Sequence, residues 1–77
     1  MIWCVEVINL KKNKTKYLLD YEIKDASATL NGIRLIGHHE RTSAGSVDFF
    51  IKNKGISLDP DLDIRDGDLL VIKGFRD

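Results

Sequence analysis

The chain has 77 residues, 43% of them hydrophobic and 31% charged, so we expect one folded domain over residues 1–77, with a single core and no second domain. Twelve basic and twelve acidic side chains cancel, which removes the overall positive field that non-specific binding to nucleic acid or an anionic membrane uses. No run of even ten apolar residues occurs, so no segment is expected to cross a bilayer.

The first third of the chain predicts two strands joined by a polar turn. Residues 2–10 are rich in β-branched side chains and alternate in character, which is typical of a strand. Residues 11–15 are polar and include an asparagine that tolerates a positive φ, and residues 16–23 alternate again. We therefore predict an antiparallel N-terminal hairpin. The two faces of its first strand would carry Trp3, Val5 and Val7 on one side and Ile2, Cys4, Glu6 and Ile8 on the other.

Residues 24–40 fit two interpretations. In a helix, Asp25 or Ser27 would cap the first turn, and apolar residues would form one stripe. In a hairpin, Asn31-Gly32 is a preferred two-residue turn. A glycine inside a helix costs about 1 kcal/mol relative to alanine. We predict the helix and keep the hairpin as the alternative.

The second half of the chain predicts strands separated by turns and one long loop. Residues 47–52 and 56–58 form strands around a turn at residues 53–55. Residues 59–68 form an irregular loop that Leu62 and Ile64 hold against the core. Residues 69–72 are an almost unbroken apolar run, which indicates a central strand buried on both faces.

The order hairpin, helix, strand, short strand, apolar strand resembles the ubiquitin-like β-grasp fold. Residues 50–56 and residues 62–72, which include the turn Asp66-Gly67-Asp68 before the last strand, are similar to the C-terminal half of small sulfur-carrier proteins and of the ubiquitin-like accessory proteins of bacterial type VII secretion. The resemblance implies an α+β fold; a small all-β barrel is the alternative. Gly74-Phe75-Arg76-Asp77 replaces the terminal Gly-Gly of sulfur carriers, which argues against a carrier role.

No pattern of catalytic, cofactor-binding or metal-binding residues is expected. The adjacent pair His38-His39 is not spaced to bind one metal ion from a regular element. Asp59, Asp61 and Asp63 lack the glycine and glutamate of an EF-hand loop. Residues 42–46 lack the Gly-Lys-Ser/Thr of a phosphate-binding loop. Cys4 is the only cysteine, so no internal disulfide forms, and a reducing, cytoplasmic location is expected.

The charges are unevenly placed, and we expect them to mark the contacts with another protein. The predicted contact residues are Lys11, Lys12, Lys14 and Lys16 on one turn and Asp59, Asp61 and Asp63 on the other. The function expected is therefore a non-enzymatic module for protein–protein contact: an adaptor, a secretion accessory or an inhibitor. The alternative is a small barrel that binds single-stranded nucleic acid through the lysine turn with Trp3, Tyr17 and Tyr21, although a domain this small is expected to place those aromatic rings in its core.

Overall fold

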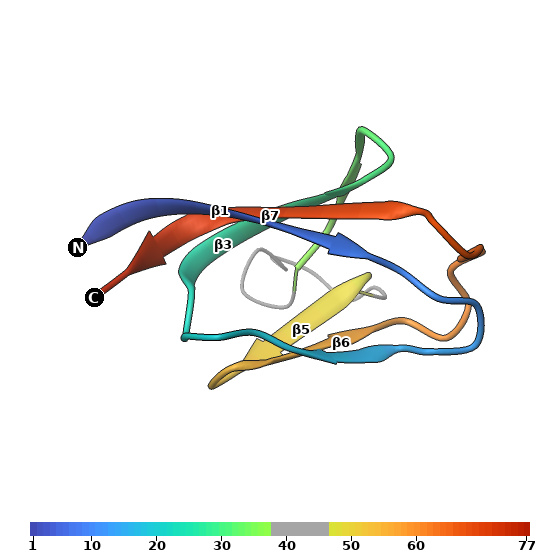
Figure 1. The fold of residues 1–77 in the computed structure, drawn as a ribbon, viewed down its shortest axis with the longest axis horizontal. Helices are drawn as coiled ribbons and strands as arrows, with labels where there is room; N and C mark the ends of the chain where they lie inside the picture. Colours follow the sequence, from blue (N-terminus) through green and yellow to red (C-terminus); the bar gives the residue numbers. More distant parts are fainter. Residues whose placement is uncertain (38–46) are drawn as a thin grey trace.

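A computed structural model describes residues 1–37 and 47–77, and these residues form β-strands and turns with no helix. The strands are β1 (Ile2–Asn9), β2 (Lys16–Leu18), β3 (Lys24–Leu30), β4 (Ile33–Leu35), β5 (Phe49–Lys52), β6 (Gly55–Leu58) and β7 (Leu69–Arg76). They pair into a sheet of order β1-β7-β3-β4 and a sheet of order β2-β6-β5. Figure 1 shows β1, β7 and β3 as one layer above β5 and β6, with both chain termini at the same end.

The predicted α+β, ubiquitin-like β-grasp fold is wrong, because the described part of residues 24–40 forms the β3–β4 hairpin. Asn31 and Gly32 have φ angles of 49° and 86°, and Leu30 pairs with Ile33 across them, which is the two-residue turn of type I′. The Asn31 side chain also accepts a hydrogen bond of 2.9 Å from the backbone N–H of Leu69. The alternative interpretation of residues 31–32 as a hairpin turn is confirmed.

The predicted N-terminal hairpin is also wrong, because β1 and β2 belong to different sheets. β1 pairs along its whole length with β7, from Ile2 opposite Arg76 to Asn9 opposite Leu69. β2 is only three residues long and pairs with β6. The alternative, a small all-β barrel, is right in its all-β content and wrong in its architecture. The described strands form two separate sheets and no closed barrel, since β1 and β2 do not pair.

The core lies between the two sheets, where alternate side chains from each layer meet. Its most deeply buried large side chains are Leu10, Phe49, Ile56, Leu70 and Ile72. The loop before β7 is held down as predicted, since Ile64 is buried and Leu62 packs against the core.

The last strand, β7, is central as predicted, but only one of its faces is buried. Leu70 and Ile72 are completely buried, whereas Leu69 is 43% exposed. The outside of the four-stranded sheet is thus left uncovered by the described residues. These residues include no helix with the length and hydropathy needed to span a bilayer.

Candidate protein-interaction surface

Alternate side chains of β1 and β7 form the side of the four-stranded sheet that faces away from the core. Leu10, Leu70 and Ile72 point into the core, so the odd-numbered side chains of these two strands point outward, since successive side chains in a strand alternate. The outer face is defined here as Trp3, Val5 and Val7 of β1, Val71, Lys73 and Phe75 of β7, Thr29 of β3 and Arg34 of β4.

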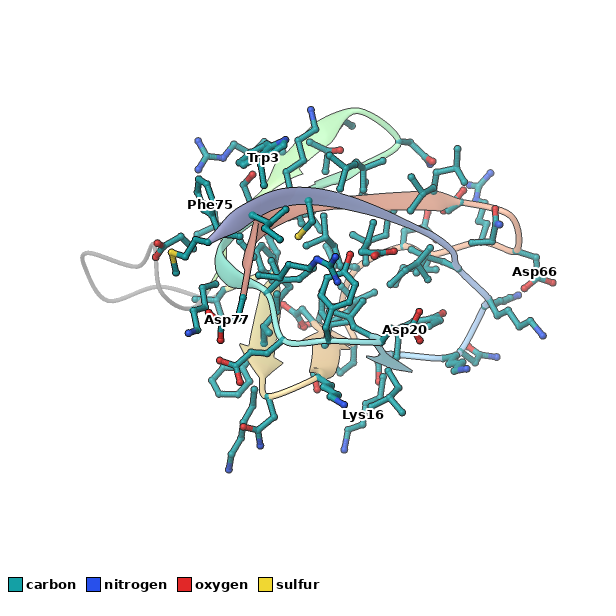
Figure 2. The ribbon with its side chains drawn as sticks, turned by 60° about the vertical axis from the view of Figure 1, so that its left-hand side comes forward. Trp3, Lys16, Asp20, Asp66, Phe75 and Asp77 are labelled. Carbon is teal, nitrogen blue, oxygen red and sulfur yellow. The ribbon has the colours of Figure 1, made fainter. Side chains whose placement is uncertain are left out.

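The β1 half of the outer face is apolar and exposed. Trp3, Val5 and Val7 are 56%, 47% and 56% exposed. Trp3 lies opposite Phe75 across β1 and β7, and the two rings meet edge to face, with centroids 5.2 Å apart. Figure 2 shows both rings at the end of the molecule opposite Asp66. These apolar side chains are thus exposed on the same side of the sheet.

The charged members of the outer face are both cations. Lys73 lies opposite Val5 on the neighbouring strand, and Arg34 lies opposite Thr29. A shallow hollow of about 380 Å³ runs between them and is lined by Ser27, Ala28, Thr29, Arg34, Val71 and Lys73. The outer face therefore combines an apolar strand with a basic hollow, which is complementary to an apolar surface that carries carboxylates.

The two charged turns predicted as contacts lie together at one end of the molecule. The backbone N–H of Lys12 donates to the carboxylate of Asp66 at 2.7 Å, and the N–H of Gly67 donates to the carbonyl of Leu10 at 3.0 Å. At the other limit of the lysine turn, the N–H of Leu58 donates to the carbonyl of Thr15. The basic and acidic segments are thus neighbours and do not form opposite poles.

Several of the predicted contact residues have structural roles in these turns. Lys14 lies over the ring of Tyr17, with its ammonium 4.8 Å from the centroid. Asp59 accepts a hydrogen bond of 3.0 Å from the backbone N–H of Asp61. Asp63 is 3.7 Å from Arg65. All of the predicted lysines and aspartates are at least partly exposed, and their role as contacts stays a prediction.

Gly67 and Asp68 shape the turn that precedes β7. Gly67 has a φ of 87°, and Asp68 accepts a hydrogen bond of 2.9 Å from the backbone N–H of Arg65. This bond, with a further one from the Asn31 side chain, lowers the pKa of Asp68 from its usual value. The carboxylate form therefore supports the turn.

The aromatic residues assigned to a nucleic-acid site are not brought together. The Tyr17 hydroxyl accepts from the N–H of Lys11 at 2.9 Å and donates to the carbonyl of Lys14 at 3.1 Å, so it organises the lysine turn. Trp3 lies near the opposite end of β1. Tyr17 and Tyr21 pack against the core as expected, but the expectation that Trp3 does so is wrong.

A small polar cluster lies under β1. The Tyr21 hydroxyl donates a hydrogen bond to the Glu6 carboxylate, and this bond, with partial desolvation, raises the pKa of Tyr21 to about 12. The guanidinium of Arg76 lies 4.7 Å from the centroid of the Tyr21 ring. Cys4, half-buried, is a free thiol on the same side of β1. This cluster accounts for a charged side chain, Glu6, on the inward face of a strand.

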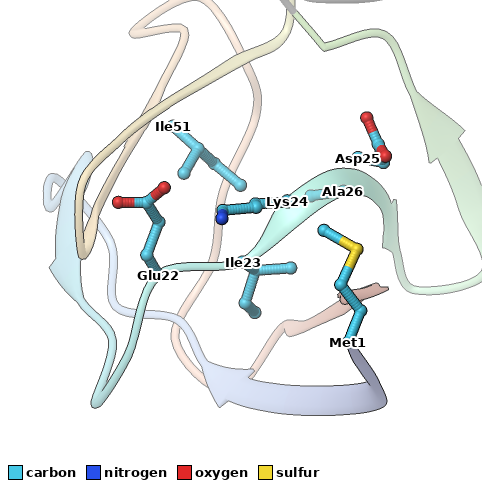
Figure 3. A pocket seen from close by; sticks show the side chains of 7 residues that line it. All are labelled: Met1, Glu22, Ile23, Lys24, Asp25, Ala26 and Ile51. Atoms are coloured by element: carbon cyan, nitrogen blue, oxygen red, sulfur yellow. The ribbon is translucent and has the colours of Figure 1, made fainter. Parts of the chain in front are cut away.

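A second hollow of about 400 Å³ opens beside the N-terminus and is lined by Met1, Glu22, Ile23, Lys24, Asp25, Ala26 and Ile51 (Figure 3). The ammonium of Lys24 is 3.4 Å from the carboxylate of Asp77. Within the described ranges no buried side-chain polar atom lacks a hydrogen-bond partner.

Residues 1–37 and 47–77 contain no group of three or more His, Cys, Asp or Glu side chains placed to hold a metal ion. The pair His38-His39 and the loop of residues 42–46 lie outside the described residues.

Comparison with known proteins gives no assignment: no family model, curated protein or solved structure matches this chain. The candidate surface therefore stands on its own geometry. Sequence reasoning grouped Trp3, Val5 and Val7 on one face of the strand but did not identify that face as exposed. The signal that could have found it is Leu10, whose even position continues the face of Cys4, Glu6 and Ile8 and fixes that face as the inner one.

Proposed function

We propose that this chain is a non-enzymatic protein–protein interaction module and that the outer face is its contact surface. The observation that supports the proposal is the exposure of Trp3, Val5 and Val7 together on one strand. Large apolar side chains placed side by side on a solvent-facing sheet are typical of surfaces that another protein covers. Exposed tryptophan is also the residue type most enriched among side chains that dominate binding energy.

The basic part of the outer face favours a partner with an acidic contact patch. Lys73 forms no ion pair within the described ranges, so its charge is available to a partner carboxylate. A cation at the border of an apolar patch steers association and fixes orientation more than it adds affinity. The proposed partner surface is therefore apolar at its centre and acidic beside Lys73. A reducing compartment such as the cytoplasm suits the half-buried thiol of Cys4 and is part of the proposal.

The test is affinity capture of the tagged chain from lysate of its native source, with and without nuclease treatment and at two salt concentrations, with matched variants. Trp3→Ser and Lys73→Glu change the outer face. Leu18→Ser and Lys16→Glu are the controls, because Leu18 is 82% exposed and Lys16 is also exposed, both on β2 of the other sheet.

We expect one protein to be retained by the unmodified chain and by both controls, and to be lost with both outer-face variants. Loss with Lys16→Glu and retention with Lys73→Glu would move the contact to the lysine turn. Recovery of nucleic acid in place of a protein, and its disappearance with nuclease, would contradict the proposal and favour the nucleic-acid alternative.

A further inference from the structure

Three of the four edge strands among the described residues are protected against pairing with another chain. The edges of the two sheets are β1, β4, β2 and β5. β2, β4 and β5 are only three or four residues long, and each carries a cation: Lys16, Arg34 or Lys52. Short length and charged side chains are the devices by which natural sheets avoid edge-to-edge association.

The remaining edge, β1, is neither short nor marked by a cation. It is eight residues long, and its pairing with β7 continues without a bulge. At about 3.3 Å per residue it is roughly 26 Å long, most of the 33 Å longest extent of the molecule. It contains no proline, lysine or arginine, and its one charged residue, Glu6, is on the inward side and bonded to Tyr21. A long, mostly apolar edge of this kind is a template for pairing with another strand.

We infer that the free edge of β1 pairs with β1 of a second copy of this chain, antiparallel and about a two-fold axis at Val5. Both copies then keep their outer faces on the same side of a continuous sheet. In this register Val5 lies opposite its own counterpart, and Trp3 lies opposite Val7 of the second copy, an aromatic–β-branched pair of the stabilising kind.

Charge selects this register. With the axis at Val5, Glu6 lies opposite Cys4 of the second copy, and no like charges meet. With the axis at Glu6, the two carboxylates would face each other, which is destabilising. With the axis at Cys4, the two strands would overlap less.

The second copy extends the outer face across the dimer. The use of this joined surface for binding rests on the proposed function. The dimer joins the outer faces into one surface with Trp3, Val5 and Val7 from each copy at its centre. Because the contact is one strand wide, we expect an area near the low end for specific interfaces, about 1,200 Å² in total. The dimer should therefore dissociate on dilution.

The test is sedimentation of the full chain over a range of concentrations, with charge substitutions at the axis. Val5→Glu places like charges opposite each other in the dimer, but within one copy it places a carboxylate opposite Lys73, a favourable cross-strand pair. Circular dichroism checks that each variant folds. We expect a concentration-dependent dimer for the unmodified chain, monomers for Val5→Glu and for Val5→Lys, and recovery of a dimer when these two variants are mixed. Leu18→Glu, on β2, should leave the dimer unchanged.

Cysteine cross-linking tests the register. In a Cys4→Ser background, Val5→Cys should form a disulfide between copies under mild oxidation, because each Cys would lie opposite its counterpart. Val7→Cys, whose site is similarly exposed, should not cross-link to itself. A chain that is monomeric at every concentration, or a dimer that survives Val5→Glu, would overturn the inference. Cross-linking through Val7→Cys and not through Val5→Cys would overturn the register. A dimer without any captured partner protein would contradict the proposed function alone.

Discussion

At Gly74, β7 passes close to Ile23, Lys24 and Ala26 at the start of β3. A Cβ atom added there would lie 2.4 Å from Cγ2 of Ile23 and 2.8 Å from the carbonyl oxygen of Lys24. Gly74→Ala should therefore destabilise the fold by about 1–3 kcal/mol, the usual cost of overpacking, measured by urea unfolding followed by circular dichroism. Gly55→Ala is the control, because its Cβ would make only an ordinary contact of 3.5 Å. Equal stability of the two variants would show that this close approach is absent.

Tyr21 gives a prediction at high pH. Its pKa is raised to about 12 by the hydrogen bond to Glu6, above the value of about 10 expected in the unfolded chain. The neutral phenol is thus favoured by folding, so its contribution to stability is fully present below about pH 10 and is lost as the pH rises toward 12. In a Tyr17→Phe background, the absorbance of ionised tyrosine should rise near pH 12, and Glu6→Gln should move that rise toward pH 10. A rise near pH 10 before this substitution would contradict the hydrogen bond.

At the residue scale, local turn chemistry could be predicted from the sequence, and the direction of β1 side chains could not. The turn through Gly67 and Asp68 depends on residues within a few positions of one another. Whether Trp3 points inward or outward depends on its partner strand, β7, which lies about 70 positions further along the chain. The composition of β1 alone, with apolar side chains on both faces, does not distinguish the two orientations.

The β3–β4 hairpin is the element for which the sequence supported two structures. Its Ala26 and Ala28 have high helix propensity, but both are buried in the sheet, and Ala26 lies beside Gly74 of β7. The small side chain of Ala26 therefore allows β3 to pack closely against β7. Tertiary contacts thus override propensity here, as they do for the N-terminal hairpin, where β1 finds a longer partner in β7 than in β2.

The turn of this hairpin carries a prediction. Gly32 has a φ of 86° and open space around it, so Gly32→Ala tests backbone strain without a steric clash. We expect a loss of about 1 kcal/mol in the free energy of unfolding, because a left-handed conformation is unfavourable for residues with a Cβ. The measurement is urea unfolding beside the Gly55→Ala control. An unchanged midpoint would contradict the type I′ turn.

At the scale of the whole molecule, residues 1–37 and 47–77 leave one large surface of the four-stranded sheet and the long edge of β1 uncovered. Net charge and composition predicted a single domain but could not reveal the free edge. The edge exists because β7 pairs with one side of the β1 backbone and no described strand pairs with the other side. We expect that Val5→Glu will convert a concentrated sample to monomer while leaving its unfolding midpoint, measured on dilute protein, nearly unchanged. A large fall in the dilute midpoint would mean that Val5 supports the fold of one copy.

Residue-resolved amide hydrogen exchange of β1 at two protein concentrations shows whether a second strand covers its free edge. In a free antiparallel edge strand, alternate N–H groups point outward without a partner. At low concentration, alternate amides of β1 should therefore exchange fast while those directed at β7 exchange slowly. At high concentration, all of them should exchange slowly, and Val5→Glu should restore the alternation. Fast exchange at every other β1 amide under both conditions would show that no second strand covers this edge and would contradict the account.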